Sequence, residues 1–320
     1  MQYTTRLWQI LACTASLLYN EAAFSQVCPI SEINVSGGYR NDTYKTTNTT
    51  KTDSDTTTQV DTIDVHNVHI GQVGVNGRLM MPDFEVCCLN NFFLSGFAYW
   101  GWNGHCGGLH EHVVSHTGAG ELTAKAKLKK AGTRDFQLGL GYLFDWNEWN
   151  IGLSAGYAYD RQNIATKSGK IAFPSGSTFI DAPLYGSGYE TTTKWEGPWI
   201  GTSLEYNECW WRFGAGYELH FADYSANHTI PDNFQARLQG VGSTIHSSQA
   251  YGNVAFVDAD YRFCDGWKLG AAFAYQYWQA NHGHLKSEDF ILDGIPTTTK
   301  VNNKAKWSAY SIILNLGCAF

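Results

Sequence analysis

Apolar and polar residues alternate one by one along much of this 320-residue chain. Residues 136–144 read FQLGLGYLF, and the same period of two recurs in 151–159, 211–220, 267–277 and 309–320. Successive side chains of a β-strand point to opposite faces, so this period indicates strands with two different faces. One face would be apolar, and the other would carry small or polar side chains.

Such strands occur in soluble β-sandwiches and in membrane barrels, and three features favour the barrel. The apolar rows begin or end on aromatic residues such as Phe144, Trp211 and Trp267, as in an interfacial aromatic girdle. The opposite rows hold Gly, Ala, Ser, Gln, Arg, Glu and His, which suits a polar lumen. The strands also run for about ten residues or more, longer than is usual in soluble sheets.

Counting the rows predicts an all-β, closed antiparallel transmembrane barrel of about ten strands. The strands are expected at 32–45, 63–79, 92–103, 134–145, 149–166, 195–207, 210–222, 251–263, 267–280 and 307–320. The connections alternate in length. Short ones are expected near 80–91, 146–148, 208–209 and 264–266, and long ones near 46–62, 104–133, 167–194, 223–250 and 281–306. Outer-membrane barrels alternate short periplasmic turns with long outer loops in this way.

The two ends of the chain fit the same interpretation. The last strand must pair with the first, because a sheet edge cannot stay unpaired in a bilayer, and it ends on the aromatic Phe320. Arg6 followed by an apolar stretch, with small residues before Gln26, predicts a signal peptide over 1–25 and a barrel over 26–320. The alternative for this first segment is a buried N-terminal helix.

Composition narrows the partners. Charged residues make up only 16% of the chain and the net charge is -7, which argues against a nucleic-acid partner. No run of 18 or more apolar residues is present, so no membrane-spanning helix is predicted.

Three segments resemble the omptin family of ten-stranded outer-membrane barrels. They read VNGRLMMPDFEV, WNIGLSAGYAYDRQNIATKSG and WEGPWIGTSLEYNECWWRFGAGYELHFADYSANH, in the order in which omptins carry them. In overall style and cysteine pattern the chain also resembles the Protochlamydia outer-membrane protein family. That second resemblance implies a porin-like role.

The omptin resemblance implies two catalytic pairs, Asp–Asp and Asp–His, that activate water. In the matching SANH segment His228 is present, but Ala226 stands at the Asp position and Asp223 is out of register. The segment after the third strand contains no Asp before Asp135. We therefore predict no catalytic residues and no enzyme activity.

A loop after the third strand is rich in metal-ligand residue types. Imidazole and thiolate suit zinc or copper, but the spacing matches no standard site, so the alternative is a solvated loop. The candidate ligands are His105, Cys106, His110, His112 and His116. No other cofactor is predicted.

Seven cysteines follow the predicted signal peptide, and an odd number in an oxidising compartment favours intermolecular disulfides or a mixture of internal pairs and free thiols. The alternative is that they are small buried residues. Those expected at the periplasmic rim are Cys28, Cys87, Cys88, Cys209 and Cys264.

Charged residues on the non-lipid rows are candidates for lining the lumen. They are Arg212, Glu218, His220, Asp258, Asp260, Arg262 and Lys268. Either they form a salt-bridged plug across a narrow barrel, or they coat a water-filled pore and set its selectivity.

We therefore expect a non-enzymatic bacterial outer-membrane barrel, in contact with outer-membrane lipid, with porin-like passage of small solutes, an envelope structural role, or both. Disulfide-linked envelope proteins are its expected partners. The alternatives are an omptin-like surface endopeptidase and an adhesin that uses the long outer loops.

Overall fold

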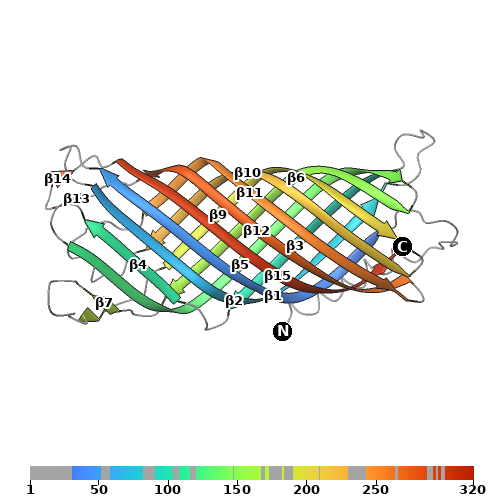
Figure 1. The fold of residues 1–320 in the computed structure, drawn as a ribbon, viewed down its shortest axis with the longest axis horizontal. Helices are drawn as coiled ribbons and strands as arrows, with labels where there is room; N and C mark the ends of the chain where they lie inside the picture. The colour runs from blue at the N-terminus through green and yellow to red at the C-terminus, as the bar shows by residue number, and fades with distance from the viewer. Residues whose placement is uncertain are drawn as a thin grey trace, which may run out of the picture.

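The computed structural model shows a β-barrel, with long strands running obliquely around it (Figure 1). It describes residues 31–51, 58–81, 91–103, 108–115, 120–146, 148, 149–166, 170–172, 182–183, 190–208, 210–229, 243–263, 266–286, 291–292, 295–296 and 300–320. No helix among these residues is long and apolar enough to cross a membrane.

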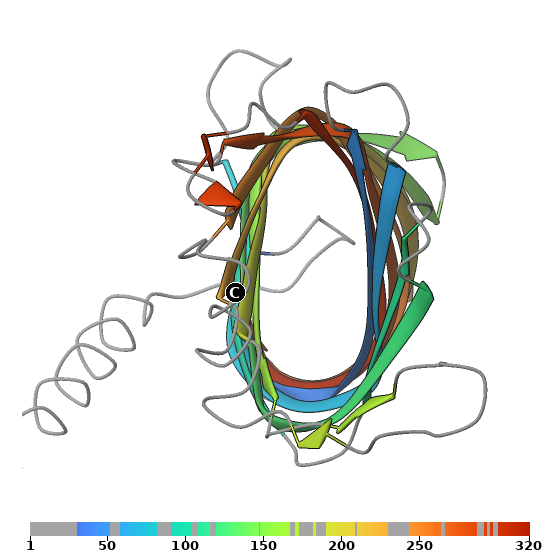
Figure 2. The ribbon, with the colours of Figure 1, turned by 90° about the vertical axis from the view of Figure 1, so that its left-hand side faces the viewer.

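Ten long antiparallel strands of the described chain build the wall. They are β1 (Glu32–Lys51), β2 (Thr58–Met80), β3 (Phe92–Asn103), β5 (Gly120–Trp146), β6 (Trp149–Thr166), β9 (Glu190–Asn207), β10 (Trp211–Thr229), β11 (Ser243–Arg262), β12 (Trp267–Lys286) and β15 (Lys300–Ala319). Each pairs with its neighbours in chain order, and β1 pairs with β15 from Glu32↔Ala319 to Lys51↔Lys300. The ring is therefore closed, with an oval outline seen end-on (Figure 2). The predicted ten-stranded barrel is confirmed.

Shorter strands lie at the end of the barrel opposite the C-terminus (Figure 1). β4 (Gly108–Ser115) continues the wall beyond β3 by pairing with β2 and β5, and β7 (Lys170–Ala172) pairs with β5. The remaining ones are β8 (Ala182–Pro183), β13 (Ile291–Leu292) and β14 (Ile295–Pro296).

The predicted outer loops were too long. Strands occupy much of 46–62, 104–133, 223–250 and 281–306, and the segment expected to be a solvated His-rich loop contains strand β4. The reason is that these polar segments continue the hydrogen-bonded ladder beyond the apolar part of the wall. Their inward side chains pair with each other, as where buried Asn303 donates to Thr46 Oγ1 at 2.7 Å.

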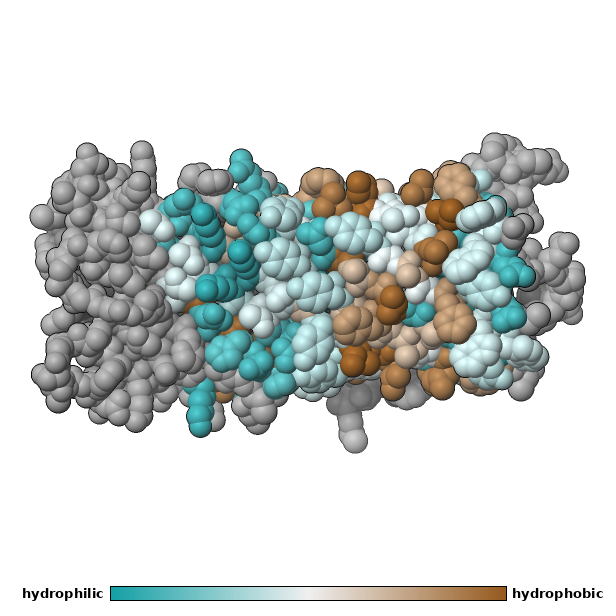
Figure 3. Space-filling view, in the orientation of Figure 1, coloured by the Kyte–Doolittle hydropathy of each residue, from teal (hydrophilic) through white to brown (hydrophobic). Residues whose placement is uncertain are grey.

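The outer surface has an apolar belt over only part of its length. Hydrophobic side chains gather in the half of the barrel nearer the C-terminus, and hydrophilic ones cover much of the other half (Figure 3). On β15 the apolar row faces outward, and Leu314 in this row is 61% exposed. The next residue, Asn315, is 9% exposed because it faces inward. The strands therefore extend beyond the membrane on the side of the long connections.

Register shifts occur in several neighbouring strand pairs where the belt ends. They lie between Asp42 and Tyr44 in the β1–β2 pair and between Ala222 and Tyr224 in the β10–β11 pair. Another lies between Ala280 and Gly283 in the β12–β15 pair. Such bulges bend strands locally, and here they mark the border between the belt and the polar extension.

Candidate functional site

The inward rows bring charged side chains from opposite walls together inside the barrel, near the end with the short turns. We call this set the basal ion network, and it consists of Glu32, Arg78, Glu205, Arg212, Asp258, Asp260 and Lys268. Its strands β1, β2, β9, β10, β11 and β12 come from both sides of the ring. All seven side chains lie on the inward face because each strand alternates in and out.

Arg212 is the centre of the basal ion network. Its Nη2 lies 2.6 Å from Asp258, its Nε donates to Asp260 at 2.8 Å, and it is 4.0 Å from Glu32 across the lumen. Glu205 lies 3.9 Å from the same guanidinium. One arginine therefore has four carboxylate partners, so that no single pair defines its position.

Two further cations, Lys268 and Arg78, pair with carboxylates of the basal ion network. Lys268 Nζ donates to Glu32 at 2.6 Å and lies 3.3 Å from Asp260, and Arg78 donates to Glu205 across the lumen. Gly214 and Gly270 make room for this arrangement, because a Cβ at either would collide with Asp258 or Asp260. Four carboxylates thus meet three cations in a space that the wall glycines leave open.

A second charged group lies farther toward the long connections. Arg40, only 2% exposed, donates from Nε to Asp42 at 2.6 Å and also to Asp135 on the far side of β2 and β3. Gln162 donates to Asp42 at 2.7 Å, and Asp160 lies beside Asp135. This Arg40 cluster, consisting of Arg40, Asp42, Asp135, Asp160 and Gln162, therefore places one guanidinium among three aspartates.

Aromatic side chains cross the lumen next to the Arg40 cluster. The aromatic cluster consists of Tyr44, Trp195, Tyr224, Trp278 and Trp307, all fully or almost fully buried. The Trp195 ring lies 5.8 Å from Trp278 and 6.4 Å from Trp307, and the Arg40 guanidinium sits 4.8 Å from the Trp307 ring centre.

A contact between Tyr44 and Tyr224 completes the aromatic cluster. Their hydroxyl groups are 2.7 Å apart, although β1 and β10 are separated by three strands on the short way around the ring. The Trp195 ring lies 4.4 Å from the Tyr224 ring. At this height the barrel is therefore filled by rings from several walls.

A cavity of about 290 Å³ lies between the basal ion network and the Arg40 cluster, and members of both line it. Glu218 and His220 also line it, 3.0 Å apart, and Gln137 donates to Glu218 at 2.9 Å. Arg40 Nη2, Asp135 Oδ1 and other buried polar atoms of the lining residues have no hydrogen-bond partner in the described part of the chain. Buried polar atoms are normally satisfied, and a polar space of this size has room for on the order of ten waters.

The lumen candidates from the sequence divide into two groups. Arg212, Asp258, Asp260 and Lys268 belong to the basal ion network, and Glu218 and His220 line the cavity. Arg262 is on the same inward row but makes no ion pair with any described residue.

Several interior residues were not predicted from the sequence. The opposing charges of the basal ion network, Glu32, Arg78 and Glu205, all sit on inward rows of strands that were predicted, so the alternation alone could have found them. The aromatic cluster gave no such signal. Its tryptophans lie on the inward row, where only small or polar residues were expected from the sequence.

The omptin-like positions occupy the polar extension. Ala226 is buried on the inward face of β10, and Asp223 lies on the outer surface, so the two are on opposite sides of the wall. His228 is in the same strand, but its side chain is outside the described part.

Most metal and disulfide candidates fall outside the described residues. His105, Cys106 and His116 do so entirely, while His110 and His112 are placed only as backbone in β4. Within the described residues no three His, Cys, Asp or Glu side chains form a metal-binding group. Cys28, Cys87, Cys88, Cys209 and Cys264 are also outside them, and Cys318 is a free thiol at the end of β15.

Comparison with known proteins identifies the family. The family model described as Protochlamydia outer membrane protein matches residues 34–320. This chain belongs to that family. It is accordingly a bacterial outer-membrane protein, and both predicted resemblances are confirmed. No curated protein matches the sequence.

Among solved structures, the outer-membrane protease OmpT from Escherichia coli matches with a TM-score of 0.61 and 13% identity. The match covers 93% of this chain and 99% of OmpT, and at this identity it shows a shared fold. The translocator domain of the autotransporter NalP from Neisseria meningitidis matches with a TM-score of 0.37 and 13% identity, covering 99% of this chain and 95% of that domain.

Proposed function

We propose that this family member is a porin-like path for water, ions and small polar solutes, and that side chains close it at rest. The observation that supports this most directly is the polar cavity between the basal ion network and the Arg40 cluster. A barrel that served only as a wall would have no need of a polar cavity in its interior. Rings of charged side chains are a common way to build selectivity in pores.

Five of the seven charges in the basal ion network have more than one described partner of opposite sign, Arg78 and Asp258 being the exceptions. Arg212 has four carboxylate partners and Glu32 has two cationic ones, so a pair can exchange for another as a solute passes. Exchange of this kind avoids the large penalty of a buried uncompensated charge. The network therefore suits a gate that opens transiently.

The Arg40 cluster sets the expected selectivity. It holds three aspartates and one guanidinium, so its field favours cations over anions. We expect a reversal potential in a salt gradient that indicates cation preference.

Planar-bilayer recordings test the proposal. The wild-type barrel should show small, brief conductance steps, because ten strands form a narrow barrel and side chains fill it at two heights. Arg212→Gln should lengthen or enlarge the openings, while Arg262→Gln, on the neighbouring strand but without an ion pair to any described residue, should leave them near wild type.

The decisive variant combines Arg212→Gln with Trp195→Ala. These substitutions remove a central side chain from the basal ion network and from the aromatic cluster, the two places where side chains fill the lumen. If that double variant folds, as shown by heat-modifiable migration on a gel, and still does not conduct, the barrel is not a pore.

A structural role in the envelope is the second candidate. Side chains from opposite walls meet across the lumen both in the basal ion network and in the aromatic cluster, which fits a rigid closed barrel. In this role the rim cysteines, among them Cys87 and Cys88, would link the barrel to other envelope proteins. Non-reducing gels of intact cells would then show high-mass species that a thiol reductant collapses, and a Cys87→Ser, Cys88→Ser variant would lose part of them.

We expect no peptide hydrolysis, because Ala226 replaces the carboxylate that the omptin resemblance requires beside His228. Incubating the refolded barrel with basic-residue peptides tests this. Turnover that disappears in His228→Ala would revive the endopeptidase alternative.

A further inference from the structure

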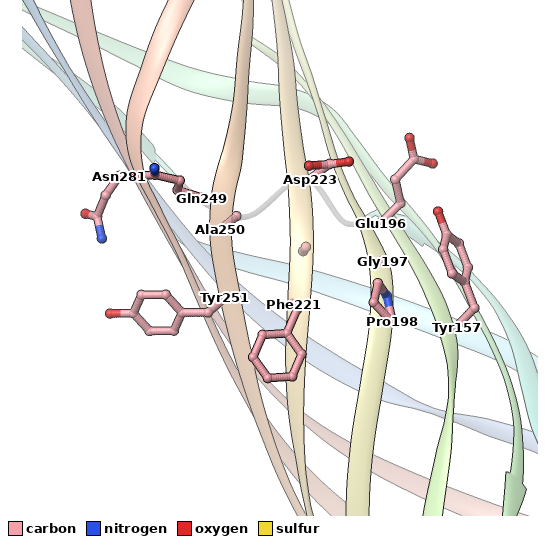
Figure 4. A pocket seen from close by; sticks show the side chains of 11 residues that line it. Tyr157, Glu196, Gly197, Pro198, Phe221, Asp223, Gln249, Ala250, Tyr251 and Asn281 are labelled. Atoms are coloured by element: carbon pink, nitrogen blue, oxygen red, sulfur yellow. The ribbon is translucent and has the colours of Figure 1, made fainter.

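A groove of about 710 Å³ lies on the outside of the wall, where the apolar belt meets the polar extension. It crosses β6, β9, β10, β11 and β12, and Figure 4 shows its side chains in two rows. Neither the lumen site nor the family match accounts for this groove.

Breaks in the strand ladders create the groove. Between β9 and β10 the pairing is interrupted from His220↔Trp199 to Asp223↔Glu196, and Pro198 within this gap has no N–H to donate. The β10–β11 register shifts just beyond Ala222. Gly197 and Ala222 contribute almost no side chain, so the floor stays low.

The upper row of the groove is polar and acidic. It consists of Glu196, Asp223, Gln249 and Asn281 (Figure 4). Lys194 lies 3.7 Å from Glu196, whereas Asp223 makes no ion pair with any described residue. The row therefore carries an excess of negative charge and two amide groups that can donate hydrogen bonds.

The lower row is aromatic and continuous with the apolar belt. Phe221, Tyr251 and Pro198 lie below the carboxylates, and the Tyr157 hydroxyl points up beside Glu196 (Figure 4). The exposed fractions of Tyr157 and Phe221 are 51% and 50%, so their rings are available to a ligand. A molecule lying here would meet aromatic faces first and the hydrocarbon region immediately below.

We propose that this groove binds the cationic amine headgroup of an outer-leaflet lipid, with the acyl chains running down the belt below Phe221 and Tyr251. The ammonium group would lie between Asp223 and Glu196 and against the ring of Tyr157, since cations are attracted to both carboxylates and aromatic faces. The amides of Gln249 and Asn281 would donate to the phosphate oxygens of the same lipid.

The rest of the outer surface above the belt argues for the amine. Lys45, Lys306 and Arg134 are outward residues on β1, β15 and β5 that do not line the groove, and they suit lipid phosphates. The groove has carboxylates at the same level instead. A lipid held only through its phosphate would therefore prefer the basic surface, and one with a free amine is favoured in the groove.

Lipid retention by the full refolded barrel tests the proposal. The barrel is placed in nanodiscs that contain equal amounts of phosphatidylethanolamine and phosphatidylglycerol with identical acyl chains, then extracted gently, and the lipids that stay bound are quantified by mass spectrometry. We expect several-fold enrichment of phosphatidylethanolamine over phosphatidylglycerol.

The double variant Glu196→Gln, Asp223→Asn keeps the size of both side chains and removes their charges. The enrichment should be lost, because the ammonium group no longer has a charged hydrogen-bond partner. Asp64→Asn is the matched control, because Asp64 is an outward carboxylate of the polar extension on β2, away from the groove, and it should leave the enrichment unchanged. Equal retention of the two lipids, or enrichment that survives in the double variant, would overturn the proposal.

Discussion

The basal ion network and the aromatic cluster close the same lumen by opposite means. In the basal ion network long charged side chains meet in exchangeable pairs above wall glycines. In the aromatic cluster large rings fill the space, and its polar contacts include the Arg40 guanidinium and the pair of tyrosine hydroxyls.

The difference between the two closures follows from what each kind of contact tolerates. Charged pairs can exchange partners while every charge stays compensated, but removing one member leaves buried charge alone. Packed rings depend on shape, so removing one leaves a cavity and little else. The basal ion network should therefore be the more sensitive to substitution and the easier to open.

The largest effect is expected for Arg212→Leu. Asp258 and Asp260 would lose their closest cation, and breaking a buried ion pair from one side costs about 3–5 kcal/mol. Urea unfolding of the barrel refolded into lipid vesicles measures the change in the free energy of unfolding.

Arg262→Leu provides the control for this substitution. Arg262 faces inward on β11 next to the network but makes no ion pair with a described residue, so its loss should cost less than about 1 kcal/mol. Equal losses in the two variants would mean that the network contributes no specific pairing.

Trp195→Ala tests the aromatic cluster and should cost about 3 kcal/mol, at the lower end of the range for a buried tryptophan. The effect is at the lower end because Trp278 and Trp307 can partly collapse into the space. The same vesicle unfolding assay measures it. A loss larger than that of Arg212→Leu would reverse the order of the two closures.

Leu314→Arg tests which side chains of β15 face the lipid and which face the lumen. The comparison of the basal ion network with the aromatic cluster depends on this assignment, because both are placed in the lumen. Leu314 is 61% exposed on the belt, and an arginine there should cost about 2–4 kcal/mol if it lies near the middle of the membrane. Asn315→Ala, on the adjacent inward position, should cost much less. Unfolding in vesicles compares them, and similar losses at both positions would contradict the assignment.

The sequence was sufficient to predict the fold, because the two faces of each strand have different solvents. Leu314 and Leu316 face lipid, and Asn315 between them faces the lumen, so the period of two is clear. It was insufficient in the polar extension. There both faces carry polar residues such as Thr and Asn, as in residues 46–51 and 300–306, so the pattern cannot distinguish a paired strand from a loop.

The site was predictable only in part, for a related reason. The alternation places Arg212, Asp260 and Lys268 on inward rows, but Glu32, which pairs with Lys268, comes from β1, and Arg78, which pairs with Glu205 on β9, comes from β2. Which side chains meet across the lumen depends on barrel closure and shear, and no local pattern contains that information. The aromatic cluster is assembled in the same way, from β1, β9, β10, β12 and β15.

The smallest effect is expected for Tyr44→Phe, which keeps the ring in the aromatic cluster and removes only its hydroxyl. The Tyr44 hydroxyl lies 2.7 Å from the Tyr224 hydroxyl, so its loss should cost about 0.5–1.5 kcal/mol, the net value of one hydrogen bond. Vesicle unfolding resolves such a change when it is compared with Tyr44→Ala, which also removes the ring and should cost several-fold more. If Tyr44→Phe destabilised the barrel as much as Tyr44→Ala, the hydroxyl pair and not ring packing would stabilise the aromatic cluster. The cluster would then depend on polar contacts, as the basal ion network does.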